Sequence, residues 1–235
     1  MARVSRLPDH DAMVVDIVAT YERATFAEMR AGRDWYPVAG RVVDGIVRAI
    51  PGADRERVTF TLAALSPRNP WLWNVADAFA YTLAGVDGDS SAPPPAATTF
   101  GVNKARAWQI ATASGPNGNP WSTAAPKVRA FVRAILGDSS AVVVDVWAIR
   151  VATAGRINAV REHEYGPVVD AYRQAADIVG EEPRDLQAIT WLVAQREGVG
   201  SHRRGRHDAT YKAGTPVTVR TIIATATIDG RKASA

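Results

Sequence analysis

One candidate nucleophile of this chain is a lysine near the start of a short helix. Pro126 fits only the first turn of a helix and Gly137 fits a helix end, so Lys127 lies in the first turn of the helix between them. Phe131 follows four residues later and shares the helix face of Lys127, away from the apolar stripe of the same helix. We therefore expect both side chains to face a cleft, with the lysine amine as nucleophile. The alternative is an ordinary surface lysine at a helix start.

An aspartate follows an apolar run eighteen residues after this lysine. The run AVVV leads directly into Asp145, and the pattern VWAIR after it predicts another helix. A carboxylate in this position can cap the helix N-terminus, and it can also act as an acid or base. The two roles are compatible, because capping fixes the rotamer of the carboxylate.

A third pair combines an amide with an indole on one face of a late helix. Gln187 and Trp191 lie four residues apart, separate from the apolar stripe formed by Leu186, Ile189 and Val193. An amide can hydrogen-bond the edge of a heterocyclic base while an indole stacks on its plane. The pair therefore suits recognition of a base. The alternative is a core tryptophan beside a satisfied glutamine.

A turn rich in polar and planar residues follows the helix expected at 55–65. The apolar helix ends at Ser66-Pro67, because the residue before a proline disfavours helical geometry. Side chains that project from such a turn can enter a duplex and replace a displaced base. The alternative is an ordinary helix–helix corner with core tryptophans. The residues concerned are Arg68, Asn69, Trp71, Trp73 and Asn74.

Apolar residues recur every three or four positions over most of the chain, which predicts an all-α protein. After residue 215 a β-branched run, TPVTVRTIIATATI, predicts one or two strands or an extended segment. We expect helices over residues 11–31, 37–49, 55–65, 71–84, 103–113, 126–136, 146–153, 167–179 and 183–196.

Composition excludes several classes of protein. With 235 residues, 47% of them hydrophobic, the chain is long enough for a substantial core. The absence of cysteine excludes disulfides, thiolate metal sites and a thiol nucleophile, so catalysis must use oxygen and nitrogen groups. No run of 18 apolar residues occurs, and the N-terminal region carries acidic residues, so we expect a soluble protein of the cytoplasm.

The net charge of +4 is distributed unevenly along the chain. From residue 196 to the C-terminus the chain carries a net charge of +5, so the first 195 residues carry −1. Arg203, Arg204 and Arg206 lie in this basic segment and suggest a polyanionic partner such as nucleic acid. The alternative is a solvated tail that only aids solubility.

In order and spacing, these elements resemble the helix-hairpin-helix superfamily of DNA glycosylases, most closely the 8-oxoguanine DNA glycosylases. In that family a polar turn probes the duplex, as LSPRN would here, and Lys-Val then opens a helix with a base-stacking residue four positions on, as Lys127 and Phe131 do. An apolar run next ends in Asp-Val, as at Asp145. A late helix carries Gln-Ala and an aromatic residue, as at Gln187 and Trp191.

The resemblance covers roughly residues 58–196 and implies both a fold and a mechanism. It implies a helical body of two lobes with a cleft between them, here residues 1–200, followed by a basic extension at residues 201–235. Lys127 would attack C1′ of a nucleotide rotated out of the duplex, displace the base and leave a Schiff base that permits strand cleavage. Asp145 would activate the lysine or stabilise charge on the sugar. No metal or organic cofactor is implied.

Two departures from the family change the expected contacts. Ser-Thr-Ala-Ala-Pro stands where the family has a glycine-rich hairpin, so Ser122 or Thr123 is expected to contact phosphate, with Arg129 as a further DNA contact. Trp147 stands where the 8-oxoguanine enzymes have histidine, and it joins Phe131 in a rebuilt base pocket. The expected substrate is therefore a damaged or otherwise modified base in duplex DNA.

Two other functions fit the same pattern. A phage-type enzyme that transfers groups to modified thymine bases would use a similar base-flipping pocket. A non-catalytic DNA-binding module would keep the fold without the chemistry. We expect a nucleoid-associated monomer that serves repair or defence against phage with modified bases.

Overall fold

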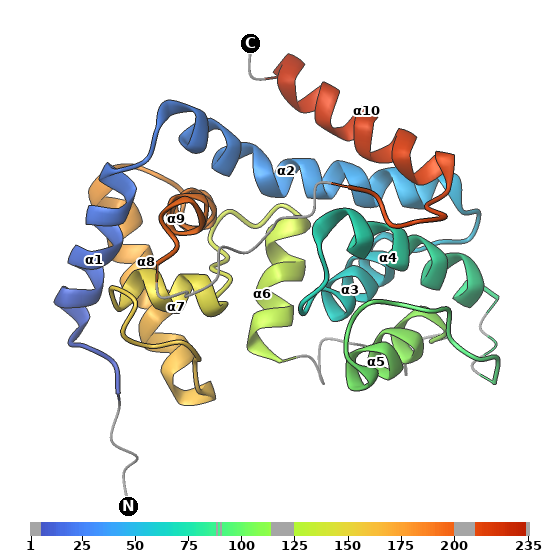
Figure 1. Cartoon of the computed structure of the whole chain (residues 1–235), viewed down its shortest axis with the longest axis horizontal. Coiled ribbons are helices and arrows are strands. Elements are labelled where there is room, and N and C mark those ends of the chain that lie inside the picture. Colours follow the sequence, from blue (N-terminus) through green and yellow to red (C-terminus); the bar gives the residue numbers. More distant parts are fainter. Residues whose placement is uncertain (1–5, 88, 90, 114–124, 200–209, 234–235) are drawn as a thin grey trace, which may run out of the picture. The chain divides into compact units, whose positions relative to one another are not determined.

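Helices are the only regular secondary structure in the described part of the chain (Figure 1). In this computed structural model the described residues are 6–87, 89, 91–113, 125–199 and 210–233, and they form ten α-helices and no strand. The prediction of an all-α protein is therefore confirmed. The helices are α1 (His10–Glu22), α2 (Phe26–Ala49), α3 (Arg55–Leu65), α4 (Trp71–Gly85), α5 (Gly101–Ala111), α6 (Pro126–Ile135), α7 (Val146–Ala152), α8 (Glu162–Val179), α9 (Pro183–Glu197) and α10 (Val217–Ala233).

Side-chain caps and left-handed glycines explain where several helices begin and end. Asp9 and Asp54 each accept a 2.8 Å hydrogen bond from a backbone N–H in the first turn of α1 and α3. Gly180 and Gly198 follow α8 and α9 with φ of 72° and 67°, a conformation in which a side chain would be strained.

The predicted boundaries were wrong around two prolines. The helix expected at 11–31 is divided, because the Thr25 and Glu28 side chains each accept a hydrogen bond from the other's backbone N–H and start a new helix, α2. That helix continues through Pro37, where a separate helix was expected to begin. Similarly, α8 begins five residues before Pro167, since the Glu164 carboxylate accepts a hydrogen bond from the backbone N–H that precedes the helix.

The strand predicted from the β-branched run after residue 215 was wrong, because this segment forms helix α10. Val219, Ile223 and Ala226 recur at helical spacing and are buried. Ile222 lies so close to Gly45 of α2 that a Cβ on the glycine would approach its Cγ2 to 2.5 Å. Burial of one helical face thus outweighs the β-propensity of the run.

The chain divides into two compact units. Unit 1 comprises residues 1–36 and 137–205, and unit 2 comprises residues 37–136 and 206–235. The described part of the segment expected to be an extension, residues 210–233, is therefore part of unit 2. None of the described helices is long and apolar enough to cross a membrane.

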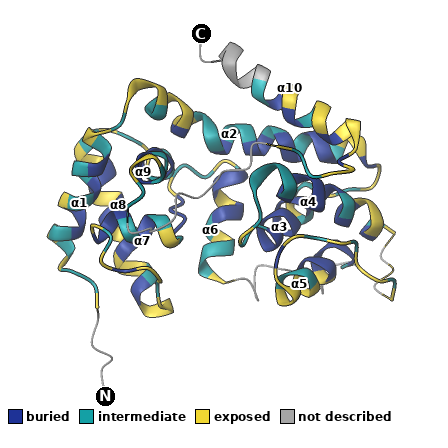
Figure 2. Ribbon diagram, viewed as in Figure 1, coloured by how far each residue is buried: buried dark blue, intermediate teal, exposed yellow. Residues whose placement is uncertain are grey.

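Each unit has its own buried core, drawn in dark blue in Figure 2. In unit 1, helices α1, α7, α8 and α9 pack around fully buried side chains that include Ile17, Ile149, Tyr172 and Leu186. In unit 2, α3 is the central helix, buried from Val58 to its end and in contact with α4, α5 and α6.

Candidate functional site

Lys127 lies at the second position of α6, in unit 2. Pro126 opens this helix as expected, and the preceding residue, Ala125, provides no side-chain cap. Ser122 and Thr123, the predicted caps and phosphate contacts, lie outside the described residues. Lys127 is partly exposed, and among the described residues it has no ion-pair partner.

Two other residues of α6 were predicted to reach the site or the DNA. Phe131 is only 9% exposed, so the prediction that it stands open in a cleft was wrong, and it is a buried side chain. The physical reason is that both apolar positions 131 and 132 of this short helix are buried, which widens the apolar stripe to include Phe131. Arg129 points from the same helix and is exposed, as a phosphate contact requires.

Asp145 caps α7, as the sequence predicted. Its Oδ1 accepts hydrogen bonds from the backbone N–H groups of Trp147 and Ala148, both at 2.9 Å. Both bonds go to one carboxylate oxygen, and within the described part of the chain the other oxygen, Oδ2, has no hydrogen-bond partner. The cap therefore fixes the side chain and leaves one oxygen for other chemistry.

A tyrosine holds the apolar run that leads to Asp145. The Tyr165 hydroxyl accepts a 3.2 Å hydrogen bond from the backbone N–H of Val144 and donates a 3.1 Å bond to the backbone oxygen of Val142. Burial raises the pKa of Tyr165 to about 12, and the negative charge of Asp145 acts in the same direction. Tyr165 therefore stays neutral and keeps both bonds over the physiological pH range.

Gln187 is engaged by a tyrosine that the sequence analysis did not single out. The Tyr36 hydroxyl, from α2, donates a 2.7 Å hydrogen bond to Oε1 of Gln187, and both residues are only 4% exposed. Burial raises the pKa of Tyr36 well above its ordinary value, and the negative charge of Asp145 again acts in the same direction. Tyr36 and Gln187, far apart in sequence, are thus brought into contact inside unit 1.

The indole that was predicted to stack on a base lies beside a second indole. Trp191 of α9 is partly exposed and meets Trp35 of α2 edge to face, with ring centroids 5.8 Å apart and planes at 75°. Trp35 is itself 4.8 Å from the ring of Tyr36. Unit 1 therefore gathers Gln187, Trp191, Trp35 and Tyr36 into one cluster, which we term the amide–aromatic cluster.

Trp147, the other predicted pocket residue, packs against the core of unit 1 and against an arginine. It is partly buried against the core of unit 1, and the guanidinium of Arg150, one turn later in α7, lies 5.0 Å from its ring centroid. This cation–π contact covers a face of the indole that a base would otherwise need. The structure thus gives Trp147 a packing role.

The turn between α3 and α4 is held by a buried aspartate. Asp77, only 2% exposed, accepts a 2.9 Å hydrogen bond from the side chain of Asn69 and one of 3.1 Å from the ammonium of Lys212. Asn74 is 1% exposed and donates to the backbone oxygen of Leu62, so it is a core residue, and the prediction that it contacts DNA was wrong. The reason is that a polar amide at this helix start is needed to satisfy a buried carbonyl.

Arg68 is the exposed residue of this turn. It is exposed, it has a left-handed φ of 56°, and its guanidinium lies 5.2 Å from the centroid of the Phe100 ring, which is 48% exposed. Trp71 and Trp73 are partly exposed, and the indole N–H of Trp73 donates to the backbone oxygen of Thr210. Most of this corner is therefore structural, as the alternative interpretation has it, and a contact of Arg68 with DNA stays a prediction.

A family of unknown function, DUF7178, has a model that matches residues 2–198. The chain belongs to DUF7178. The match covers helices α1 to α9 and stops before α10. No curated protein and no solved structure matches the chain.

In this DUF7178 protein the two units differ in charge. Unit 2 has 15 Lys and Arg residues against 8 Asp and Glu residues, whereas unit 1 has 13 against 16. The predicted contacts Arg203, Arg204 and Arg206 lie outside the described residues. The sequence analysis missed a further signal, since no acidic residue occurs between Asp89 and Asp138. That stretch contains Lys104, Arg106, Lys127, Arg129 and Arg133.

The ion pairs of the DUF7178 protein are also distributed unevenly between the two units. Among the described residues, unit 1 contains most of the ion pairs, including Arg6 with Glu164 and Arg156 with Asp16. Arg106 and Arg129 of unit 2 are exposed and have no acidic neighbour in their stretch of chain. Unit 2 therefore offers cations for a polyanion, while those of unit 1 mostly neutralise its own carboxylates.

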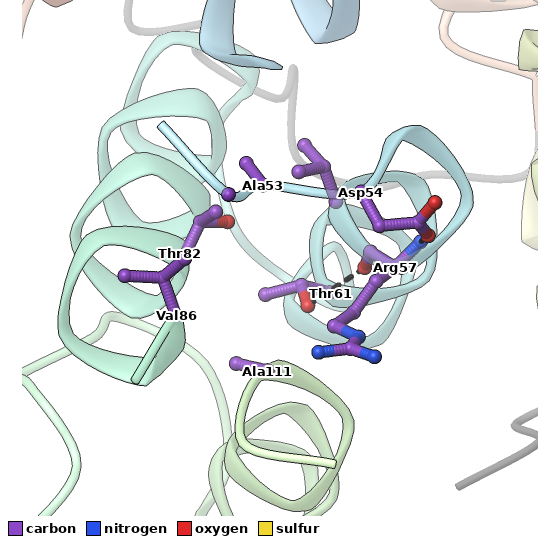
Figure 3. Close-up of a pocket in the computed structure, with 9 residues that line it drawn as sticks. Ala53, Asp54, Arg57, Thr61, Thr82, Val86 and Ala111 are labelled. Atoms are coloured by element: carbon purple, nitrogen blue, oxygen red, sulfur yellow. Dashed lines mark hydrogen bonds between the residues drawn. The ribbon is translucent and has the colours of Figure 1, made fainter. Parts of the chain in front are cut away.

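A small pocket in unit 2 is too small to be the base pocket. It lies between α3, α4 and the end of α5, and Figure 3 shows Arg57, Thr61, Thr82 and Ala111 around it. Its volume of about 10 Å³ is close to the space of one water molecule. Thr82 Oγ1 is buried there without a hydrogen-bond partner among the described residues. None of the predicted site residues lines this pocket.

Proposed function

We propose that this protein is a DNA glycosylase with lyase activity that excises a damaged or modified base from duplex DNA. The observation that carries the proposal is the amide–aromatic cluster, in which the buried Tyr36 phenol holds Gln187 and Trp191 packs against Trp35. An amide and an indole in one cluster can hold a flipped-out base, and a carboxylate fixed by a helix cap in the same unit can act at its sugar. Gln187, Trp191 and Asp145 are among the residues that the resemblance to glycosylases assigned to the site.

The nucleophile in this proposal is Lys127. Its unprotonated amine forms a bond from Nζ to C1′ while the bond from C1′ to the base nitrogen breaks. The base leaves with the electron pair of that bond and takes up a proton. The adduct then passes a proton from its nitrogen to the ring oxygen O4′, and the C1′–O4′ bond breaks to give a protonated Schiff base. Removal of a proton from C2′ expels the 3′ phosphate and cleaves the strand.

Asp145 supports this reaction through the carboxylate oxygen that the helix cap leaves unused. A negative charge held beside the sugar stabilises the positive charge that develops as the base departs. Because the two N–H bonds to Oδ1 fix the carboxylate before substrate arrives, little reorganisation is needed during the reaction. Acid–base groups of this type typically contribute about 10²–10⁴-fold to rate.

Unit 2 supplies the affinity for DNA in this proposal. Its excess of basic residues and the acid-free stretch between Asp89 and Asp138 provide cations that can neutralise phosphates and release counterions. Lys127 itself belongs to this stretch, so binding of the backbone brings phosphates to the helix that carries the nucleophile.

Reductive trapping with borohydride tests the proposal. The full chain is incubated with duplexes that contain an abasic site or one of a series of modified bases, reduced, and resolved on a denaturing gel. We expect a covalent adduct that is lost in Lys127→Ala and kept in Lys104→Ala, a matched lysine of the same acid-free stretch. An adduct that persists in Lys127→Ala would show that Lys127 is not the nucleophile.

The same experiment separates the other functions. Base release without an adduct, unchanged in Lys127→Ala, would indicate a glycosylase without lyase activity. A mass increase of the DNA base in the presence of a donor would indicate a group transferase. Binding of every duplex with no chemical change would indicate a DNA-binding module and overturn the proposal.

A further inference from the structure

The amide of Gln187 is a buried group with one end satisfied and one end free. Its Oε1 accepts the hydrogen bond from Tyr36, whereas its Nε2 has no hydrogen-bond partner within the described part of the chain. Although the residue as a whole is only 4% exposed, Nε2 is not among the fully buried side-chain atoms that lack a partner, so it keeps access to the outside. An accessible amide donor whose oxygen is held by a neighbour can meet a ligand that brings an acceptor.

Tyr36 takes the oxygen end of the amide. Its phenol is neutral, because burial and the negative charge of Asp145 both raise its pKa, and in the structure it donates its proton to Oε1. In this arrangement the amide presents the N–H donors of Nε2 on its other side. The hydrogen-bonding polarity of Gln187 in the structure is therefore that of a donor toward a ligand.

Close helix packing brings the tyrosine to the amide. Gly32 of α2 faces Ile189 of α9, and a Cβ on the glycine would lie 2.7 Å from the backbone nitrogen of Ile189. Tyr36 lies one turn after Gly32 on the same helix face, and Gln187 lies two residues before Ile189. The absence of a side chain at position 32 thus allows the approach that the hydrogen bond requires.

A planar group shares the helix face of the amide. Trp191 lies one turn after Gln187 on α9 and is partly exposed, with Trp35 edge-on at 5.8 Å. An indole beside a hydrogen-bond donor suits a flat heterocycle that stacks on one group while its edge meets the other. The cluster therefore fits a nucleobase better than a sugar or a phosphate.

We propose that Tyr36 is a specificity-determining residue and that the base recognised by Gln187 presents a carbonyl oxygen, not an amino group, to the amide. This inference rests on the proposed function for the presence of a flipped-out base. Oxo bases such as thymine, uracil and their 5-substituted forms meet the two donors with an acceptor. Adenine and cytosine types would bring an amino donor against an N–H donor, which leaves both groups unpaired.

Binding to matched duplexes tests this inference separately from catalysis. Each duplex carries one 2′-fluoro nucleotide, which resists glycosidic cleavage, opposite an abasic analogue, so that the unpairing cost is similar for every base. The ratio of affinities for 5-substituted uracil and the corresponding 5-substituted cytosine is measured by fluorescence anisotropy. We expect the wild-type chain to favour the uracil form by at least about tenfold.

Three variants locate the origin of the ratio. Tyr36→Phe frees the amide to rotate, so the ratio should fall toward one. Gln187→Glu replaces the donors by acceptors, so the preference should reverse toward the cytosine form. Tyr21→Phe, which removes the hydroxyl that donates to Glu181 elsewhere in unit 1, should leave the ratio unchanged. Circular dichroism melting confirms that each variant is folded. If one of the variants does not fold, Gln187→Leu takes its place, and it should also give an affinity ratio of one.

The outcomes distinguish this inference from the proposed function. A wild-type ratio of one, a ratio that survives Tyr36→Phe, or failure to bind any of the duplexes overturns the inference. A covalent adduct through Lys127 together with a ratio of one would leave the glycosylase proposal intact. A tenfold ratio without adduct or base release would retain the inference for a protein that reads bases without excising them.

Discussion

Gly32 of α2 lies against the backbone of Ile189 in α9, so closely that a Cβ at position 32 would be 2.7 Å from the nitrogen and 2.8 Å from the Cα of Ile189. Real Cβ atoms do not approach backbone atoms to such distances, and backbone cannot move aside as a flexible side chain can. The glycine is therefore a requirement of this helix contact, which carries the Tyr36–Gln187 hydrogen bond one turn away.

Gly32→Ala is expected to lower the free energy of unfolding by about 1–3 kcal/mol, because the added methyl group overpacks the contact between α2 and α9. Urea denaturation measures this change. Gly101→Ala is the control, since Gly101 also lies in a helix, at the first residue of α5, and has no atom within 4 Å of a Cβ built on it. That variant should change the unfolding free energy by less than about 1 kcal/mol, and in the stabilising direction. Equal effects at the two positions would contradict the packing argument.

Substitutions of Asp145 can separate its cap from its proposed chemistry. Asparagine caps a helix as well as aspartate does, so Asp145→Asn should change stability by less than about 0.5 kcal/mol while it reduces base release by about 100-fold or more. Asp145→Ala removes both roles and should also cost about 1 kcal/mol of unfolding free energy. Single-turnover assays and thermal melts measure the two effects. Full activity in Asp145→Asn would show that the residue is only a cap.

Neutralisation of two exposed arginines of unit 2 tests the location of the DNA contact. The plot of the logarithm of the DNA-binding constant against the logarithm of salt concentration has a negative slope. The double variant Arg106→Gln, Arg129→Gln should make this slope less steep by about 2, since each phosphate that is no longer neutralised removes about 0.9 from its magnitude. The control, Arg30→Gln with Arg173→Gln, removes the same charge from unit 1 and should leave the slope nearly unchanged. Equal slopes for both double variants would place the contact elsewhere.

The ion pair of Glu164 with Arg6 makes part of the stability depend on pH. Glu164 has no exposed side-chain surface, and the hydrogen bond and charge of Arg6 lower its pKa from 4.5 to about 2. A carboxyl whose folded pKa is lowered contributes stability that is complete above pH 4.5 and is lost as pH falls toward 2. The contribution is therefore fully present at neutral pH.

Glu164→Gln should accordingly reduce the unfolding free energy at pH 7 by about 1.5–3 kcal/mol, the value of hydrogen bonds to a charged group. Urea titrations from about pH 7 to about pH 3 should show the difference from wild type shrinking below pH 4.5. Asp170→Asn breaks an ion pair whose carboxylate is 64% exposed, so it should cost less than about 0.5 kcal/mol at any pH. A difference for Glu164→Gln that stays constant with pH would contradict the assignment.

Local signals in the sequence were sufficient for many features of the fold. Asp145 caps α7 and Pro126 opens α6, as predicted, because caps and helix-compatible prolines act through their own neighbouring backbone. The same local rules predicted most of the helices. They failed for the β-branched run at 215–228, most of which lies in helix α10 because its apolar positions at helical spacing are buried in unit 2.

In the candidate site, too, the residue types could be predicted from the sequence, whereas the contacts between distant residues could not. The types and spacing of Lys127, Asp145, Gln187 and Trp191 suggested chemistry directly from the chain. Nothing in the sequence paired Gln187 with Tyr36, since their hydrogen bond depends on the approach of α2 to α9.

By itself, then, the sequence determined the all-α class, most helix positions and the residues able to do chemistry, because these depend on periodicity, caps and composition within a few residues. Only the tertiary structure decided that Phe131 and Asn74 are buried, that residues 210–233 belong to unit 2, and that Tyr36 engages Gln187. Each of these depends on which distant helices pack together, and packing is decided by the shapes of several helices at once.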